Sequence, residues 1–305
     1  MVEYTPEGKG RDARRLTEAQ LAEAFEQGSI LESTALAYDR DRQLVFELAG
    51  RPAHMPHDEC AAGAAQGEVR DVALLTRVGR PTCFCITALP EEGGGVYLLS
   101  RRLAQEACRK NHLDTLVPGE LVKCVVTHLE NFGAFCDVGC GISALLPIDC
   151  MSVSRIQSSA DRVGVGQTLT CAVKSRDEKG RLVLTLRELL GTWQENADRF
   201  RAGETVVGLV RSVESYGVFI ELAPNLAGLA ERCEGLRPGQ PVSVFIKSIL
   251  PEKMKIKLVI VNRELAGPLF FAPRYFITGG RLEHWVYSTP GSKKRIETDF
   301  GPAAL

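Results

Sequence analysis

Two short stretches of the chain place a glycine between two aromatic residues, FGAF at 132–135 and YGVF at 216–219. Both lie in strand-like surroundings, where glycine is unfavourable because it costs backbone entropy and packs against nothing. The chemistry that such rings offer is stacking. Successive strand residues face opposite sides, so two interpretations stay open. Either the glycine bends the strand and both rings face outward, or one ring of each pair belongs to the core.

Histidines and cysteines at short spacing are the other candidates for chemistry, as in His54-x-x-His57-x-x-Cys60 and Cys136-x-x-x-Cys140. A set of four metal ligands with consistent spacing is missing, so we expect no metal site. No glycine-rich phosphate loop follows a strand and opens a helix. No nucleophile motif is recognisable. We therefore expect no catalytic residue, no cofactor and no small-molecule substrate.

The second aromatic motif belongs to an internal repeat of the first. Phe132 falls on Tyr216 at a shift of 84 residues, and at the same shift Glu130 falls on Glu214 and Leu145 on Leu229. Agreement at one shift without a gap indicates a true repeat.

Each copy continues with a Gly-Gln turn, an apolar run, a charged turn and a short alternating strand. The closing strands read KGRLVLTL at 179–186 and KMKIKLVI at 253–260. One copy therefore predicts five short strands, which suits a small closed barrel without exposed edges. Residues 78–87 and 95–103 resemble the last two strands of such a copy, so the first hundred residues hold a degraded third copy without the aromatic motif.

Helical patterns separate the copies, at 17–28, 100–113 and 186–200. Thr17 and Gln20 fit a capping box at the start of the first helix. The tail from residue 263 predicts a hairpin with its turn at Gly279-Gly280, followed by a third strand. The six aromatic residues between Phe270 and Tyr287 should be partly buried against the third barrel, Tyr275 and Trp285 by preference. The basic run at 293–295 should stay solvated.

Composition gives weak support to any single partner. The net charge is −1, and residues 202–305 carry 13 basic and 10 acidic side chains, so a polyanion would prefer this part of the chain. No apolar stretch approaches the roughly 20 residues of a membrane span, and the polar start does not resemble a signal peptide. The ten cysteines, diluted over 305 residues, suit reduced thiols in a cytoplasmic protein.

Together these motifs resemble the S1 RNA-binding domain, an OB-fold barrel. The resemblance rests on the aromatic-Gly-x-Phe strand, on the following GISALLP or NLAGLAE, and on the closing GRLVLTL. It covers 118–189 and 202–262, and it extends without the aromatic motif to 28–105. Repeated in tandem, the motifs resemble a short form of the ribosomal protein S1 family.

The resemblance implies outward rings that stack on unpaired bases, and a glycine that bends the strand and lets RNA approach the backbone. The RNA-binding residues it implies are Phe132, Phe135, Arg181, Tyr216, Phe219 and Lys255. The family usually adds a histidine after Gly-Leu-x, where this chain has Pro147 and Glu231. We expect the second barrel to carry most of the binding, because Glu231 in the third opposes phosphate.

Two functions remain open. The chain either binds single-stranded RNA, such as mRNA, in translation, with the small ribosomal subunit as a candidate partner, or it is a scaffold that docks on the ribosome or an RNA-degradation complex with little RNA affinity.

The predicted fold is mainly β, with tandem five-stranded OB-fold barrels joined by helical linkers and a β-rich C-terminal extension. We predict the following parts: an N-terminal helix (1–27), a degenerate S1-like barrel (28–105), a linker (106–117), an S1 domain (118–189), a linker helix (190–201), a second S1 domain (202–262) and an aromatic and basic β-hairpin extension (263–305).

Overall fold

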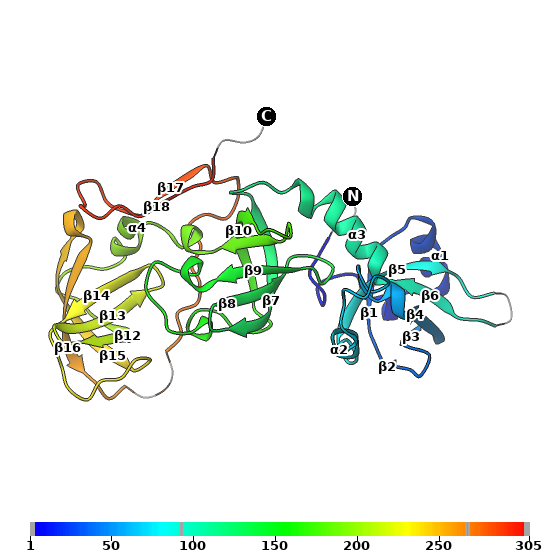
Figure 1. The fold of residues 1–305 in the computed structure, drawn as a ribbon. Helices are drawn as coiled ribbons and strands as arrows, with labels where there is room; N and C mark the ends of the chain where they lie inside the picture. The colour runs from blue at the N-terminus through cyan, green and yellow to red at the C-terminus, as the bar shows by residue number, and fades with distance from the viewer. Residues whose placement is uncertain (1–3, 92–93, 266, 268, 302–305) are drawn as a thin grey trace. The chain divides into compact units, whose positions relative to one another are not determined.

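The computed structural model describes residues 4–91, 94–265, 267 and 269–301. The chain forms two compact units, Met1–Leu116 with Asp137–Ser143, and Val117–Cys136 with Ala144–Leu305. Each unit is built mainly from β-strands, as the sequence predicts (Figure 1).

The second barrel contains the first aromatic motif and is a closed five-stranded barrel. Its strands are β7 (Leu121–Glu130), β8 (Gly133–Asp137), β9 (Ser143–Pro147), β10 (Thr168–Arg176) and β11 (Leu182–Thr185). Their order is β10-β11-β9-β8-β7, and β10 pairs back onto β7. β9 and β11 run parallel, while β10 pairs antiparallel with both β7 and β11. Alternate residues, such as Val122, Cys124 and Val126, fill the interior.

The third barrel repeats this topology in the same unit. It consists of β12 (Thr205–Glu214), β13 (Gly217–Ala223), β14 (Leu226–Ala230), β15 (Pro241–Leu250) and β16 (Lys255–Asn262). The order β12-β13-β14-β16-β15 closes through β15 and β12, and again the third and last strands are parallel. Closure leaves neither barrel with an unpaired edge.

The first unit follows the same connectivity with an interrupted first strand. Its sheet has the order β1-β5-β6-β4-β3-β2. β1 (Leu31–Thr34) and β2 (Ala37–Tyr38) lie at opposite ends of that order, so they correspond to two halves of one strand broken at Ala35–Leu36. The other strands are β3 (Gln43–Leu48), β4 (Arg51–Pro56), β5 (Pro81–Ala88) and β6 (Tyr97–Ser100).

The helices of the first unit pack around this sheet. α1 (Glu18–Glu26) begins with the predicted capping box of Thr17 and Gln20. α2 (Asp71–Leu75) precedes β5, and α3 (Arg101–Asn111) falls where a helix is predicted at 100–113.

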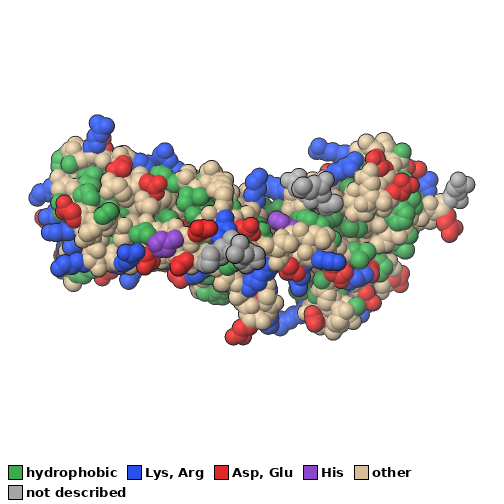
Figure 2. Space-filling view, turned by 90° about the horizontal axis from the view of Figure 1, so that it is seen from above, with side chains coloured by type: hydrophobic (Ala, Val, Ile, Leu, Met, Phe, Trp, Pro, Cys, Tyr) green, Lys and Arg blue, Asp and Glu red, His purple; other side chains and the backbone are tan. Residues whose placement is uncertain are grey.

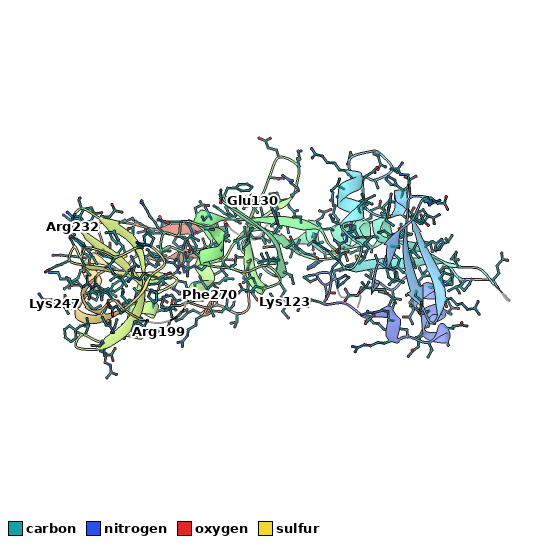
Figure 3. The ribbon with its side chains drawn as sticks, turned by 90° about the horizontal axis from the view of Figure 1, so that it is seen from below. Lys123, Glu130, Arg199, Arg232, Lys247 and Phe270 are labelled. Carbon is teal, nitrogen blue, oxygen red and sulfur yellow. The ribbon has the colours of Figure 1, made fainter. Side chains whose placement is uncertain are left out.

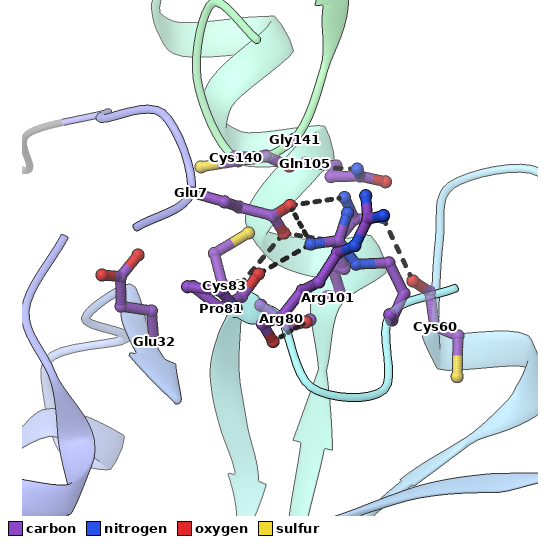
Figure 4. A network of polar contacts seen from close by, with 12 residues as sticks. Glu7, Glu32, Cys60, Arg80, Pro81, Cys83, Arg101, Gln105, Cys140 and Gly141 are labelled. Atoms are coloured by element: carbon purple, nitrogen blue, oxygen red, sulfur yellow. Dashed lines mark hydrogen bonds and ion pairs between the residues drawn. The ribbon is translucent and has the colours of Figure 1, made fainter. Parts of the chain in front are cut away.

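The first unit also includes residues 137–143, which come from the loop between β8 and β9. Thr5 accepts a hydrogen bond from the N–H of Cys140 at 2.9 Å, and the Gln105 side chain donates to the Cys140 carbonyl at 3.0 Å. Beside this loop, Glu7 is buried and accepts from Arg101 Nε at 2.7 Å (Figure 4). Burial alone would raise the pKa of Glu7, but Arg101 and Arg77 outweigh it and lower the pKa.

The helix predicted at 186–200 is interrupted. A 3-10 helix spans Arg187–Leu190, and α4 (Trp193–Ala197) starts anew with a capping box at Thr192. Gly191 separates them with φ of 84°, and a Cβ there would lie 2.6 Å from the Phe276 ring. The left-handed residue therefore ends the first segment, which the apolar spacing did not reveal.

The tail differs from its prediction in two ways. Its hairpin is β17 (His284–Val286) with β18 (Glu297–Asp299), and the turn expected at Gly279-Gly280 is not part of it. Trp285 is buried against the third barrel as predicted, but Tyr275 packs on the second barrel, where its hydroxyl accepts from the N–H of Thr170 at 3.0 Å. Burial raises the pKa of Tyr275 to about 12. The tail therefore joins both barrels of its unit.

Candidate nucleic-acid interface

The two rings of each aromatic motif lie on the same outer face of their barrel. Phe132 is 56% exposed and Tyr216 is 67% exposed, while Phe135 and Phe219 are half-buried. In both pairs the ring centroids are 6.1 Å apart and the ring planes meet at 88°. Phe132 and Tyr216 lie in turns just before β8 and β13, outside the strand alternation. The interpretation that one ring of each pair belongs to the core is therefore wrong.

The glycine between the rings is required by a neighbouring strand. A Cβ on Gly133 would lie 2.5 Å from the carbonyl oxygen of Leu146, and a Cβ on Gly217 would lie 2.5 Å from that of Ala230. Both glycines are buried. The expectation from the resemblance is that this glycine lets RNA approach the backbone. In the structure, the absence of a side chain instead lets the neighbouring strand, β9 or β14, pack closely against the glycine.

A groove of about 530 Å³ adjoins the ring pair of the third barrel. Tyr216 and Phe219 line one side, and three lysines from β15 and β16 line the other: Lys247, Lys255 and Lys257. Across the parallel pair of strands, Lys257 lies opposite Leu229. Within the described ranges, none of these three lysines forms an ion pair. Their charges are therefore available to an anionic ligand.

One acidic residue, Glu231, lines the same groove, at the end of β14. Its position agrees with the expectation that it opposes phosphate at this end. The lysines approach from the other strands, so the groove keeps an excess of positive charge. Figure 2 shows Lys and Arg side chains over the third-barrel part of the chain, and Figure 3 labels Lys247 and Arg232 at its surface.

The second barrel holds fewer available cations beside its rings. Arg181 donates through Nε to Asp177 at 2.7 Å. The pKa of the Asp177 carboxyl is lowered, most of all by the hydrogen bond that it accepts from the backbone N–H of Arg181. Lys174 donates to the Cys150 sulfur at 3.1 Å. Val183 pairs with Leu145 in the second barrel, and Lys257 pairs with the equivalent Leu229 in the third. The second barrel therefore has an apolar residue at the position of Lys257.

A histidine adjoins the ring pair of the second barrel from an unexpected strand. His128, on β7, stacks on Phe135 with centroids 6.5 Å apart and planes at 27°. Its Nε2 lies 2.9 Å from Glu130 Oε1. At the 84-residue shift the third barrel has Ser212 in this place. The resemblance places a histidine at the position of Pro147 on β9, whereas His128 lies on β7, two strands earlier in the chain.

Sequence reasoning missed His128, Lys247 and Lys257 as site residues. The alternation of β16 carried a usable signal, because Lys255 and Lys257 share the outward side of a strand whose Ile256 and Leu258 are buried. Neighbouring strands bring Lys247 and His128 to the rings, which spacing along the chain does not show.

The first unit has charged side chains where the other barrels have rings. The turn between β2 and β3 carries Asp39, Arg40, Asp41 and Arg42, and Arg42 donates to Asp71 at 2.9 Å. The predicted loss of the aromatic motif in the first copy agrees with this turn.

The histidine and cysteine spacings noted in the sequence lead to other partners. His57 lies 3.2 Å from Asp71, whereas the Cys60 thiol donates to the carbonyl of Pro56 at 3.3 Å. Among the described residues, no group of three or more His, Cys, Asp or Glu side chains is placed to hold a metal ion. The helices described are all too short or too polar to cross a membrane.

Comparison with known proteins identifies the second barrel. Residues 116–187 match the family model of the S1 RNA binding domain. The chain is 31% identical over 180 residues to small ribosomal subunit protein bS1 of Staphylococcus haemolyticus, covering 53% of this chain and 46% of that protein. It is 33% identical over 153 residues to the bS1 protein of Leuconostoc lactis, covering 46% and 35%. These matches confirm the predicted resemblance, and the chain spans less than half the length of either relative.

Solved structures show partial similarity. The solution structure of GSP13 from Bacillus subtilis has 24% identity and a TM-score of 0.23, covering 24% of this chain and 57% of that one. A multidomain protein with nucleic acid binding domains from Streptococcus pneumoniae has 15% identity and a TM-score of 0.25, covering 78% and 75%. Scores this low add nothing to the family match.

Proposed function

We propose that this chain binds single-stranded RNA, such as mRNA, on the ring pairs of its second and third barrels, and works in translation with the small ribosomal subunit as a partner. The observation that carries the proposal is that two barrels have, at equivalent positions, an edge-to-face ring pair of the same geometry, each with one exposed ring and one half-buried ring. The relatives named as small ribosomal subunit proteins support the ribosomal setting. The role is binding in the cytoplasm and not catalysis.

The chemistry favours single strands without strong sequence preference. An unpaired base of any kind has a flat face that can stack on Phe132 or Tyr216, which is worth about 1–3 kcal/mol per base. The bases of a duplex are already stacked and paired, so they cannot reach these rings. The proposed phosphate contacts are Arg181, just before the closing strand β11, and Lys255, the first residue of the closing strand β16.

The geometry favours the third barrel as the stronger site, which reverses the ranking expected from Glu231. Three lysines that form no ion pair with any described residue adjoin Tyr216 and Phe219, whereas Arg181 beside the other ring pair is already engaged by Asp177. Electrostatic attraction to phosphate is therefore greater at the third barrel. His128, stacked on Phe135, adds a further ring to the second barrel.

Fluorescence anisotropy with labelled oligouridine of about ten nucleotides, a length within the usual range for one or two OB-folds, tests the proposal. The variants are Phe132→Ala with Phe135→Ala, and Tyr216→Ala with Phe219→Ala. Each double variant should weaken binding, and the second should weaken it more. Competition with a duplex of the same length should be poor.

The matched control is Phe25→Ala, which removes an exposed ring on α1, outside both barrels. It should bind RNA like the parent protein. If both double variants keep parental affinity and a parental thermal melt, the rings do not bind RNA and the proposal fails.

A second candidate function is protein docking by the first unit, and one observation favours it. Apolar side chains are exposed on α2 and around the break in the first strand: Leu36, Val72, Leu75 and Val78. The unit also lacks the ring pair. This part of the chain is therefore suited to binding a protein partner.

The two functions separate in a ribosome co-sedimentation experiment. Val72→Glu, at an exposed position of α2, should reduce recovery with small ribosomal subunits and leave oligouridine affinity unchanged. Equal recovery of the variant and the parent protein would remove this candidate.

A further inference from the structure

The outer face of the third barrel stays apolar beyond the groove. Phe245 on β15 is 36% exposed, Val259 on β16 is 46% exposed, and Val207 and Val261 are exposed beside them. These residues alternate with buried ones, such as Val244 and Ile246, that fill the interior of the barrel. This face is therefore an outward surface with an aromatic ring in it.

Phe245 is continuous with the groove through strand pairing. Val259 lines the groove, and Phe245 lies directly opposite Val259 in the antiparallel pair of β15 and β16. Lys247 follows Phe245 by two residues on β15, and Lys257 precedes Val259 by two residues on β16. Both lysines are exposed while Ile246 and Leu258 are buried, so they lie on the outward side with this pair, Lys247 at a bulge in β15. A bound RNA strand that runs from Tyr216 along the lysines therefore reaches Phe245 next.

The equivalent face of the second barrel is covered. Ala172 on β10 pairs with Thr185 on β11, at the positions equivalent to Phe245 and Val259. Both Ala172 and Thr185 are buried. Leu282 and Phe300 of the tail pack on Ala172. Where the second barrel has a small residue under the tail, the third has an exposed aromatic ring.

We propose that Phe245 is a third stacking ring of the third barrel, which holds a base of single-stranded RNA after the strand has passed Tyr216 and the lysines. The proposal rests on the proposed function and extends it to a longer binding path. It assigns more nucleotides to the third barrel than to the second, because among the described residues this face is open in the third barrel and covered in the second.

The charges around Phe245 favour an anionic occupant over a second copy of the chain. Lys247 and Lys257 adjoin the ring, and two copies of this face would bring their lysines together. Glu204, just before the Thr205 that pairs with Phe245, accepts from the backbone N–H of Arg201 at 2.8 Å. A polyanion with flat apolar groups matches the combination of lysines and ring.

The test compares oligouridines of about four and about ten nucleotides, which bracket the shorter end of OB-fold site sizes. Phe245→Ala should bind the longer RNA about 5- to 150-fold more weakly and the shorter RNA like the parent protein. Tyr216→Ala should weaken both. Phe245→Trp should keep the affinity for the longer RNA, whereas Phe245→Leu, which keeps an apolar side chain of similar size, should lose it.

Each other outcome overturns the proposal in a recognisable way. If Phe245→Ala binds the longer RNA like the parent while Tyr216→Ala is weakened, Phe245 is no subsite and the proposed function stands. If neither variant is weakened, the proposed function fails as well. If Phe245→Leu binds as tightly as the parent, the ring does not stack. If Phe245→Ala leaves RNA binding unchanged but converts a dimer to a monomer in analytical ultracentrifugation, a second copy occupies this face.

Discussion

Arg162 donates through Nη2 to Glu221 Oε1 at 2.5 Å, and neither side chain is exposed to solvent. Arg162 follows β9 of the second barrel, while Glu221 lies on β13 of the third. Arg211, on β12, donates through Nε to the other Glu221 oxygen at 2.5 Å. Burial lowers the pKa of Arg162, and Glu221 opposes this shift. The two barrels therefore share a buried junction of charges.

Glu221→Gln should strongly destabilise the protein, because it leaves the buried guanidinium group of Arg162 without a counter-charge, whereas Arg211 keeps Asp161 at 3.3 Å. Removing one partner of a buried pair costs about 3–5 kcal/mol, and urea denaturation measures the loss. Asp177→Asn is the control, since it breaks the exposed pair with Arg181 and should hardly move the midpoint. Equal midpoints for Glu221→Gln and the parent would show that the junction contributes no stability.

Gly133→Ala and Gly217→Ala should each destabilise their barrel by about 1–3 kcal/mol, because the new methyl group meets a backbone carbonyl that cannot move without disturbing the next strand. Thermal melting followed by circular dichroism measures the effect. Gly164→Ala is the control in the same unit, since its Cβ would meet nothing within 4 Å. A Gly133→Ala protein that melts like Gly164→Ala would contradict the close approach of β9.

Asp137 should make the stability of the first unit depend on pH. Its Oδ2 accepts from the N–H of Glu7 at 2.8 Å, and burial, followed by repulsion from Glu7, raises the pKa of Asp137 to about 6. Because the folded pKa exceeds the ordinary value of 3.8, the folded state binds the proton more tightly. This contribution is present below about pH 4 and is lost as pH rises through about 6.

The change amounts to about 2–3 kcal/mol for a shift of this size. Denaturation of the parent and of Asp137→Asn from pH 4 to pH 7 isolates it, since the other titrating groups are common to both proteins. The stability of the parent relative to the variant should fall over this range. A constant difference would mean that the pKa of Asp137 is not raised.

Lysine substitutions in the groove should reduce both the RNA affinity and its salt dependence. Lys255→Gln and Lys257→Gln should each lower the slope of log K against log salt by about 0.7, the value for one phosphate contact with a single strand. Arg181→Gln should change the slope less, because Asp177 already neutralises Arg181. Lys293→Gln, in the exposed basic run of the tail, is the control and should leave the slope unchanged.

The barrels and the ring pairs could be predicted from the sequence because the repeat carries both. The alternation of apolar residues fixes which side of each strand is inside, and the 84-residue shift places Tyr216 where Phe132 stands. The outward direction of Phe132 does not follow from alternation, because alternation alone does not show that this residue belongs to the turn before β8.

Features that depend on distant parts of the chain were not predictable. Gly191 interrupts a helical pattern because Phe276 packs against it from the tail. Tyr275 lies on the second barrel through a hydrogen bond to Thr170, which is 105 residues away. The lysine groove arises where β14, β15 and β16 meet, so only the barrel topology reveals that Lys247 joins Lys257.

The discontinuity of the first unit has a consequence for how the protein is made. The unit consists of two chain segments: a long one that ends at Leu116 and a short one, Asp137–Ser143. During synthesis its sheet can form early, but Thr5, Glu7 and Gln105 gain their partners on this loop only after most of β7 and β8 has left the ribosome. The first unit therefore matures in step with the second barrel, and a nascent chain arrested before residue 137 should still be open to proteases at its N-terminal segment.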